Sequence, residues 1–445
     1  MSHALTPLQS RAVALAPVLP LVAVLALLAL PLASHGAGPA DVVSGLMVVY
    51  CVIRLLRERR RPLSTTAAVV LGLPVVGFAL AAMGASSPET GLSGLGRYLQ
   101  IFVLVPAAVL LLIRDRGDFR LLAWSFVGLA LWQGAIGVHQ YVTRTGASYQ
   151  GEDIRAVGTF GAHDVMGMAA AVSLGLVCAV AIALGPAPVR QRAIAAGCAL
   201  ALLLPLALSF SRGAWIATAL TCTAQLVLTG LRRALKVAAA AAAAGVILVG
   251  GFGVGTAMLQ ERINSIAQVT DAPDQSVVDR YTLWASAIGI WRQHPLTGVG
   301  VKGFPQYRDG HATLALSSGA EIAGAGAAYQ KQALLSPHNM YLLVLSEQGL
   351  IGLLTLAGSW LALLVCGLRG LLRVRGPGLD CALVACGLLI WFLTDFVYGD
   401  IGGPSTVLTA MGLGLVAWWA LAGEKRVGVV PRDGVRERVE EAVAR

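Results

Sequence analysis

Long apolar stretches separated by short polar turns dominate the sequence. A helix that crosses a membrane needs about 20 apolar residues, and twelve segments come close to that length. The pattern therefore predicts an all-α polytopic membrane protein with about twelve transmembrane helices. The predicted spans are residues 12–34, 40–56, 64–84, 97–113, 121–140, 163–184, 191–209, 212–230, 237–258, 338–367, 378–398 and 404–423.

The first span also resembles a signal peptide, because Arg11 precedes its apolar run and small residues occupy 33–37. The run is longer than a normal signal core, and eleven further spans follow it. We therefore interpret it as a membrane span.

The longest gap between spans divides the chain. Residues 259–337 form one loop, and a long loop is usually functional. We predict transmembrane helices 1–9 in residues 1–258, a periplasmic loop domain in 259–337, helices 10–12 in 338–423 and a cytoplasmic tail in 424–445. Within the loop we expect a helix from Val278 to His294 that lies across the membrane surface and ends at Pro295. Apolar side chains at three- and four-residue spacing would form one face of it, namely Val277, Tyr281, Trp284, Ile288 and Trp291.

Composition and charge agree with a membrane protein. Hydrophobic residues make up 57% of the chain and charged residues 13%, whereas about 25% of a soluble domain is charged. The net charge of +10 does not indicate nucleic-acid binding, because 23 of the 33 Lys and Arg residues fall on the side of the membrane that holds the N-terminus. Positive residues favour the cytoplasm, so both termini are predicted to be cytoplasmic. All seven cysteines lie in predicted spans, so we expect no disulfide framework.

Cationic side chains recur on the opposite, outer side. Arg97, Arg155, Arg212 and His338 lie at or just before the starts of even-numbered spans. A helix start carries partial positive charge, so a cation there is unfavourable by about 0.3–1 kcal/mol. The repeated arrangement predicts an anion between the cations, as in a membrane enzyme that handles a phosphorylated lipid.

Two arginines are the strongest candidates for binding that anion. Arg212 lies in a very short turn between two spans, where a charge is costly unless it is paired or faces water. Arg280 lies near the start of the predicted loop helix, and a guanidinium donates two hydrogen bonds to phosphate at once. Alternatives remain: a salt bridge within the bundle for Arg212, a local pair with Asp279 for Arg280, and lipid headgroup contacts for Arg97 and Arg155.

His338 is the candidate general base. Pro337 suits a first helical position with Ser336 as the cap, which would place His338 in the first turn of the tenth span. A helix start lowers the pKa of a nearby histidine, and a neutral imidazole is the form that accepts a proton. The alternative is a capping or packing histidine. Glu347 is interpreted as a structural acid, and Asp395 and Asp400 as acids able to pair with an arginine.

The acidic residues of the outer side do not form a convincing metal site. Glu152–Asp153 and residues 271–274 are the nearest acidic pairs, and neither supplies a set of oxygen ligands. A cage of arginines neutralises a pyrophosphate leaving group as a metal would. We therefore expect no metal and no cofactor.

Several short motifs resemble the O-antigen ligase and polymerase superfamily over about residues 90–400. They are Ser211-Arg212-Gly213 with Trp215, Asp279-Arg280-Tyr281, His338-Asn339-x-Tyr341-Leu342, Glu347-x-Gly349-Leu350-x-Gly352, and Arg155 with Gly158-Thr159-Phe160. The His-Asn-x-Tyr-Leu element after a large outer loop is fairly specific for the superfamily but does not select one member. One departure is His163-Asp164, where Asn or Pro would be expected, so the role of that stretch is open.

The resemblance implies a type C glycosyltransferase of the bacterial inner membrane with its active site on the periplasmic face. Such ligases move O-antigen from undecaprenyl pyrophosphate to the lipid A–core oligosaccharide of lipopolysaccharide. By this resemblance Arg212 and Arg280 would hold the pyrophosphate, and His338 would be catalytic. We add Arg155 and Arg97 as further pyrophosphate contacts, and Asn339 and Tyr341 as supporting residues.

The predicted reaction is a metal-independent, inverting displacement. Two alternatives share this chemistry, namely O-antigen polymerase and a protein O-oligosaccharyltransferase. A third alternative, from another class, is a transporter of anionic lipid, which would place charges and broken helices at mid-membrane depth. The clustering of the cations at one interface favours an enzyme.

Overall fold

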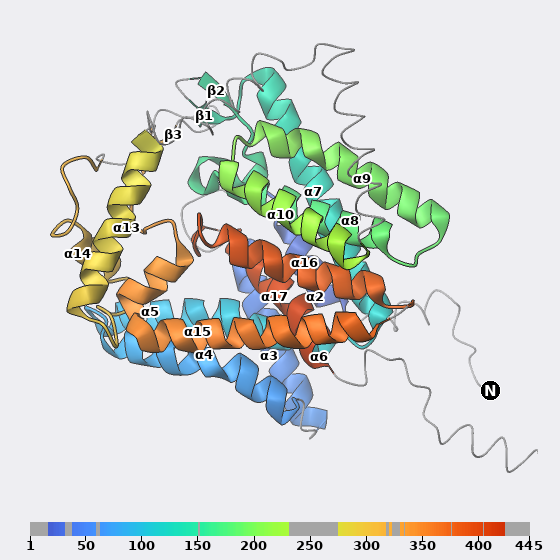
Figure 1. The fold of residues 1–445 in the computed structure, drawn as a ribbon, viewed down its shortest axis with the longest axis horizontal. Helices are drawn as coiled ribbons and strands as arrows, with labels where there is room; N and C mark the ends of the chain where they lie inside the picture. Colours follow the sequence, from blue (N-terminus) through green and yellow to red (C-terminus); the bar gives the residue numbers. More distant parts are fainter. Residues whose placement is uncertain are drawn as a thin grey trace, which may run out of the picture.

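The computed structural model describes residues 17–31, 38–58, 63–149, 152–230, 275–316, 320–322, 330–332, 334–374, 376–403 and 405–422. These residues form a mostly helical bundle with two small β-hairpins (Figure 1). The helices are α2 (Leu19–Leu27), α3 (Pro39–Glu58), α4 (Thr65–Met83), α5 (Pro88–Leu99), α6 (Val105–Leu112), α7 (Arg116–Thr143), α8 (Gly167–Leu184), α9 (Val189–Leu208), α10 (Arg212–Leu228), α13 (Gln275–Gln293), α14 (Phe304–Arg308), α15 (Met340–Arg373), α16 (Leu379–Asp395) and α17 (Thr406–Leu421).

Among the described residues, seven helical segments are long and apolar enough to cross a membrane. This confirms a polytopic membrane protein. The predicted span 237–258 and the tail 424–445 lie outside the described residues, so the total of twelve spans and the domain boundaries stay predictions. The seven segments are Pro39–Glu58, Thr65–Met83, Pro88–Leu112, Arg116–Thr143, Gly167–Leu184, Val189–Leu208 and Met340–Arg373.

The predicted start of the fourth span is wrong by nine residues. The helix begins at Pro88, where the hydroxyl of Ser87 accepts a hydrogen bond from the Thr90 backbone at 3.2 Å. It continues through a π-helical turn, η1 (Gln100–Leu104), into α6. Hydropathy missed the first turns because Pro88–Leu99 is rich in Gly and polar residues, although Ser87-Pro88 is a strong helix start.

The centre of the bundle is formed by α8, α16 and α17. Most of their side chains are buried, whereas α3 and α9 expose a wide apolar face of the kind that contacts lipid. Small residues allow this close packing: a Cβ on Gly175 of α8 would lie 2.2 Å from the Cβ of Ala130 in α7. The amide of Gln225 in α10 donates to the carbonyls of Val177 and Leu383, both at 3.1 Å, and so joins α10 to α8 and α16.

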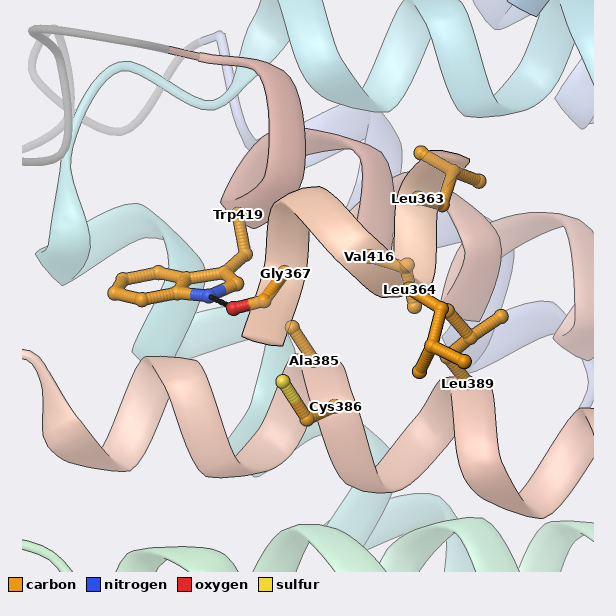
Figure 2. A pocket seen from close by; sticks show the side chains of 8 residues that line it. All are labelled: Leu363, Leu364, Gly367, Ala385, Cys386, Leu389, Val416 and Trp419. Atoms are coloured by element: carbon orange, nitrogen blue, oxygen red, sulfur yellow. Dashed lines mark hydrogen bonds between the residues drawn. The ribbon is translucent and has the colours of Figure 1, made fainter. Parts of the chain in front are cut away.

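An apolar notch lies between α15, α16 and α17 (Figure 2). Leu363, Cys386 and Trp419 are among its lining residues, and the Trp419 indole N–H donates to the Gly367 carbonyl at 3.1 Å. No charged side chain lines the notch. The notch lies in the second half of α15, far along the helix from His338. We therefore interpret it as a gap between packed helices and not as a reaction site.

α15 is interrupted at Gly349, which has φ 65° and ψ −165°. α13 runs across the end of α15 and α4 rather than alongside them (Figure 1). The hairpins β1 (Ala147–Tyr149) with β2 (Glu152–Arg155) and β3 (Ala320–Ile322) with β4 (Gln330–Gln332) are both antiparallel, with Ala147 opposite Arg155 and Ala320 opposite Gln332.

The predicted loop helix is confirmed as α13, within a few residues at each end. The predicted apolar face is not the face that is buried in the protein: Leu283, Ser286 and Ile290 are buried, whereas Tyr281 is 57% exposed. Tyrosine and tryptophan often lie at a surface with one side in contact with water.

Candidate functional site

The loop between α16 and α17, residues 396–405, connects most of the predicted site residues. The first backbone N–H of α15, on Met340, donates to the carbonyls of Phe396 at 2.9 Å and Gly399 at 3.0 Å. These bonds use an amide that a helix start leaves without an intrahelical partner. The α16–α17 loop is therefore fixed against the segment that carries His338.

His338 lies two residues before α15, not in its first turn as predicted. Asn339 is the N-cap, and its side-chain oxygen accepts the Leu342 N–H at 3.0 Å. His338 has φ 49°, a left-handed conformation that is uncommon for a residue other than glycine. Asparagine and serine are comparable caps. The left-handed conformation of His338 decides the start, because it keeps this residue out of the helix, which begins after Asn339.

Burial lowers the pKa of His338 below its ordinary value of 6.5. The negative charge of Asp400 opposes this shift, and the positive charge of Arg280 adds to it. The predicted direction is correct, but its main cause is burial and not the helix start. The imidazole is thus favoured in its neutral form and lies near one acid and one arginine.

α13 brings Arg280 to His338. The indole N–H of Trp284 donates to the Pro337 carbonyl at 2.9 Å, which joins α13 to the residue before His338. Arg280 lies one helical turn before Trp284, on the same side of the helix, and interacts electrostatically with both His338 and Asp395. The sequence prediction that Asp395 is near an arginine agrees with this arrangement.

α10 brings Arg212 to the same loop. Arg212 is the first residue of α10, and the hydroxyl of the N-cap Ser211 accepts the Ala214 N–H at 3.3 Å. A Cβ on Gly213 would lie 3.0 Å from the Cβ of Tyr398, and the Tyr398 ring lies 6.5 Å from that of Trp284. Tyr398 thus packs between the helices that carry Arg212 and Arg280, and the glycine after Arg212 permits the close approach.

Arg155 lies against the turn that precedes Arg212. Its Nε donates to the Ser209 carbonyl at 3.0 Å, and the Ala156 N–H donates to the Leu208 carbonyl at 3.1 Å. The expectation that Arg155 marks a helix start is wrong, because it ends β2 and α8 begins only at Gly167. The fold nevertheless brings Arg155 and the Arg212 turn together.

Arg97 has a different environment from the one predicted. It lies in the last turn of α5, inside a continuous helical segment, and forms an ion pair with the buried Asp41 of α3. Its guanidinium also donates to the Gly403 carbonyl at 3.1 Å. These contacts favour a structural role, in which Arg97 joins α3 and α5 to the α16–α17 loop.

The two predicted supporting residues make structural contacts. Asn339 caps α15, as described above. The Tyr341 hydroxyl donates to the Leu393 carbonyl at 2.7 Å and so joins α15 to α16. Both contacts hold the helix start behind His338 in place.

Sequence reasoning missed Tyr398 and the role of Asp164. Asp164 ends the 3₁₀ segment η2 (Gly158–Asp164) and accepts the Ser405 N–H at 2.9 Å, at the start of α17. Burial raises the pKa of Asp164, and this hydrogen bond opposes the shift. The available signal was the run Tyr398-Gly399-Asp400 followed by two glycines at 402 and 403, which marks a tight polar turn directly after an apolar span.

Within the described ranges, no group of three His, Cys, Asp or Glu side chains could hold a metal ion. The acidic residues 271–274 lie outside those ranges. The absence of a metal requirement stays a prediction.

The arrangement combines a general base with cations at one end of the bundle. A half-buried imidazole of lowered pKa can accept a proton, and neighbouring guanidinium groups can stabilise an anionic leaving group. No curated protein matches the chain. Residues 196–357, which include Arg212, Arg280 and His338, match the family model described as O-antigen ligase, and this match supports membership of the chain in the O-antigen ligase superfamily.

Proposed function

We propose that the protein is an O-antigen ligase that transfers polysaccharide from undecaprenyl pyrophosphate to the lipid A–core oligosaccharide, on the periplasmic face of the inner membrane. One observation carries the proposal: Tyr398 packs between the helices of Arg212 and Arg280, beside the segment of His338. The family match over residues 196–357 supports it.

In the proposed mechanism His338 accepts the proton of an acceptor sugar hydroxyl. The oxygen attacks the anomeric carbon of the donor from the face opposite the pyrophosphate. The new glycosidic bond forms as the bond from the anomeric carbon to the pyrophosphate oxygen breaks, so the configuration inverts. Arg212 and Arg280 stabilise the negative charge on the departing pyrophosphate, with Arg155 behind the Arg212 turn as a further cation.

Asp400 has a place in this mechanism. Its charge acts on His338, and its Oδ2 is buried with no hydrogen-bond partner among the described residues. A carboxylate beside a catalytic imidazole stabilises the imidazolium that forms when the proton is taken up. Asp400 therefore supports the role of His338 as base.

The broken helix α15 does not favour a transporter. In transporters, broken helices leave backbone groups that coordinate the cargo at mid-membrane depth. Here the groups released at Gly349 hydrogen-bond to the loop segment 295–300. Loop residues thus occupy the break in α15, and this favours the enzyme hypothesis over the transporter.

The test is transfer by purified protein in vitro, with a defined lipid-linked donor, a lipid A–core acceptor and a chelator. Arg212→Ala, Arg280→Ala and His338→Ala should each lower the rate by about 10²–10³-fold. Arg292→Ala, an exposed arginine on α13 outside the proposed site, is the matched control and should keep wild-type activity. Wild-type transfer by His338→Ala and Arg212→Ala would contradict the proposal.

A cellular assay separates the ligase from its alternatives. Loss of a ligase leaves bare lipid A–core on a lipopolysaccharide gel while lipid-linked polymer accumulates. Loss of a polymerase instead leaves core with a single repeat unit. Unchanged lipopolysaccharide with loss of a glycosylated protein would identify a protein O-oligosaccharyltransferase.

A further inference from the structure

We infer that Glu347 is a positioning residue that, through the break in α15, holds α13 and its Arg280 in register with His338. The inference rests on the proposed function, because it assigns Glu347 a role in the same reaction. We call the contact between loop residues 295–304 and α15 residues 346–351 the Gly349 clasp.

The clasp replaces helical hydrogen bonds with bonds to the loop. The carbonyls of Ser346 and Glu347 accept the N–H groups of Val299 at 3.0 Å and Gly300 at 2.9 Å. Beyond the break, the N–H groups of Leu350 and Ile351 donate to the carbonyls of Pro295 at 2.9 Å and Leu296 at 3.2 Å. Backbone groups at membrane depth must be satisfied within the protein, so the loop segment is an integral part of α15.

The Glu347 side chain completes the clasp. It is only 4% exposed, and its Oε1 accepts the Phe304 N–H at 3.2 Å, at the start of α14. A buried carboxylate is costly unless hydrogen bonds compensate for the lost water. The acid therefore ties the far end of the loop segment, five residues beyond Val299, to the same turn of α15.

Two glycines make this approach possible. A Cβ on Gly349 would lie 2.2 Å from the Leu296 carbonyl oxygen, and a Cβ on Gly298 would lie 2.3 Å from the Glu347 carbonyl carbon. Both residues also have positive φ, 65° and 67°. The Glu-x-Gly motif thus specifies one contact, in which glycine provides the space and glutamate provides the hydrogen-bond acceptor.

The loop segment is also fixed on its other side. The Val301 N–H donates to the Ala81 carbonyl at 3.0 Å, and the Gln306 amide donates to the Ser86 hydroxyl at 3.2 Å. Ala81 and Ser86 lie at the end of α4 and in the turn to α5. Segment 295–304 therefore cannot shift without disturbing α4 or α15.

α13 enters the clasp directly, because it ends at Gln293 and Pro295 already bonds to α15. Its other attachment is the bond from Trp284 to Pro337, beside His338. These two attachments, one to the break in α15 and one to Pro337 just before α15, fix both the position and the axial rotation of α13. Removing the Glu347 bond loosens one of them and displaces Arg280 relative to His338.

The experiment measures donor KM and kcat for Glu347→Gln, Glu347→Asp and Glu347→Ala, each alone and combined with Arg280→Ala, in the purified transfer assay. Glu347→Ala should lower kcat/KM by about 10²-fold, the size expected for a misplaced catalytic group, with a raised donor KM. Glu347→Gln should stay within several-fold of wild type, because its amide oxygen can still accept the Phe304 N–H. The shorter Glu347→Asp should be intermediate.

The combined variants distinguish positioning from a general loss of folded protein. If Glu347 acts through Arg280, Arg280→Ala/Glu347→Ala is no slower than Arg280→Ala. A merely structural role lowers kcat with KM unchanged and multiplies the two losses, which would overturn the inference. Glu347→Asp replaces Glu347→Ala in the cycle if the alanine variant does not accumulate, and Glu89→Ala, an exposed outer acid, is the control.

Three further outcomes are decisive. If the transfer rate of Glu347→Gln is as low as that of Glu347→Ala, the negative charge or a proton of Glu347 matters rather than its acceptance of a hydrogen bond. This result would overturn the inference. Full activity of Arg280→Ala would instead contradict the proposed function. A slow Arg280→Ala with an unaffected Glu347→Ala rejects the positioning role alone.

Discussion

The two ends of the bundle are held together in different ways. At the end where α7 and α16 begin, which we call the Asp380 end, arginines pair with acids of the protein: both Asp118 oxygens accept from Arg114, and both Asp380 oxygens accept from Arg120. At the opposite end, the His338 end, many contacts use loop backbone: Trp284 donates to Pro337, Arg155 to Ser209, and Met340 to Phe396 and Gly399.

The difference indicates a division of roles. An arginine paired with a buried acid compensates the charge of that acid, so the pair contributes mainly to the integrity of the folded state. A bond from a side chain to a backbone carbonyl orients that side chain without adding an opposite charge beside it. We therefore expect loss of an ion-pair partner at the Asp380 end to change stability, and loss of a proposed reacting group at the His338 end to change activity.

The largest effect is expected for the proposed base, His338. His338→Asn should lower transfer by about 10²–10⁴-fold, the usual contribution of general base catalysis. Its thermal unfolding in detergent should remain close to wild type, because the described contacts of His338 are few. Rate and melting temperature measured on the same preparation test this, and a large drop in melting temperature with preserved specific activity would break the comparison.

The opposite pattern is expected for Arg120→Ala. Asp380 is 3% exposed, and a buried acid that loses its partner destabilises a protein by about 3 kcal/mol. The melting temperature should fall while the specific activity of the folded fraction stays unchanged. The double variant Arg120→Gln/Asp380→Asn should recover part of the stability, since it removes both charges; failure to recover would argue against the pair as the cause.

The pH dependence of transfer is a finer test of the His338 end. Because the pKa of His338 is lowered below 6.5 and its neutral form is the base, kcat/KM should stay high as the pH falls to 6.5 and decline only below it. Arg280→Ala removes a charge that lowers this pKa, so its inflection should move to higher pH. Asp400→Asn should move the inflection to lower pH, and equal inflections in all three proteins would contradict the assignment.

The smallest effect is expected for Tyr341→Phe. It deletes the hydroxyl that donates to Leu393 at 2.7 Å, a contact worth about 1 kcal/mol. The variant should lose a few degrees of melting temperature and keep most of its transfer activity. Loss of activity on the scale of His338→Asn would show that the hydroxyl contacts the substrate.

The apolar pattern of the sequence predicted the helices in which that pattern is strong. It did not predict helix starts or breaks that depend on the backbone conformation of single residues. The start of α10 at Arg212 follows from Ser211-Arg212-Gly213, which combines a cap with a glycine. The start of α15 was misplaced because the left-handed conformation of His338 leaves no mark in the apolar pattern. The break at Gly349 was also missed, since glycine alone does not reveal that a loop from elsewhere in the chain occupies it.

The candidate site was also predictable only in part. Arg212, Arg280 and His338 were identified by residue type and motif, and the fold brings their segments to one loop. The ion pair of Arg97 was missed because its partner Asp41 lies 56 residues earlier in the chain, and hydropathy carries no information on such pairings. Tyr398 has no chemical signal of its own, since its role comes only from the helices it separates.

The bond from Arg97 to Gly403 extends the working unit beyond the part of the chain that matches the family model. Through Arg97 and its ion pair with Asp41, helix α3 supports the α16–α17 loop. A chimaera that grafts residues 196–357 onto the helices of another protein matching this family model would lose this support unless α3, α5 and the α16–α17 loop came with the graft. Exchange of specificity between relatives should therefore be sought in the outer loops, with the helical scaffold kept whole.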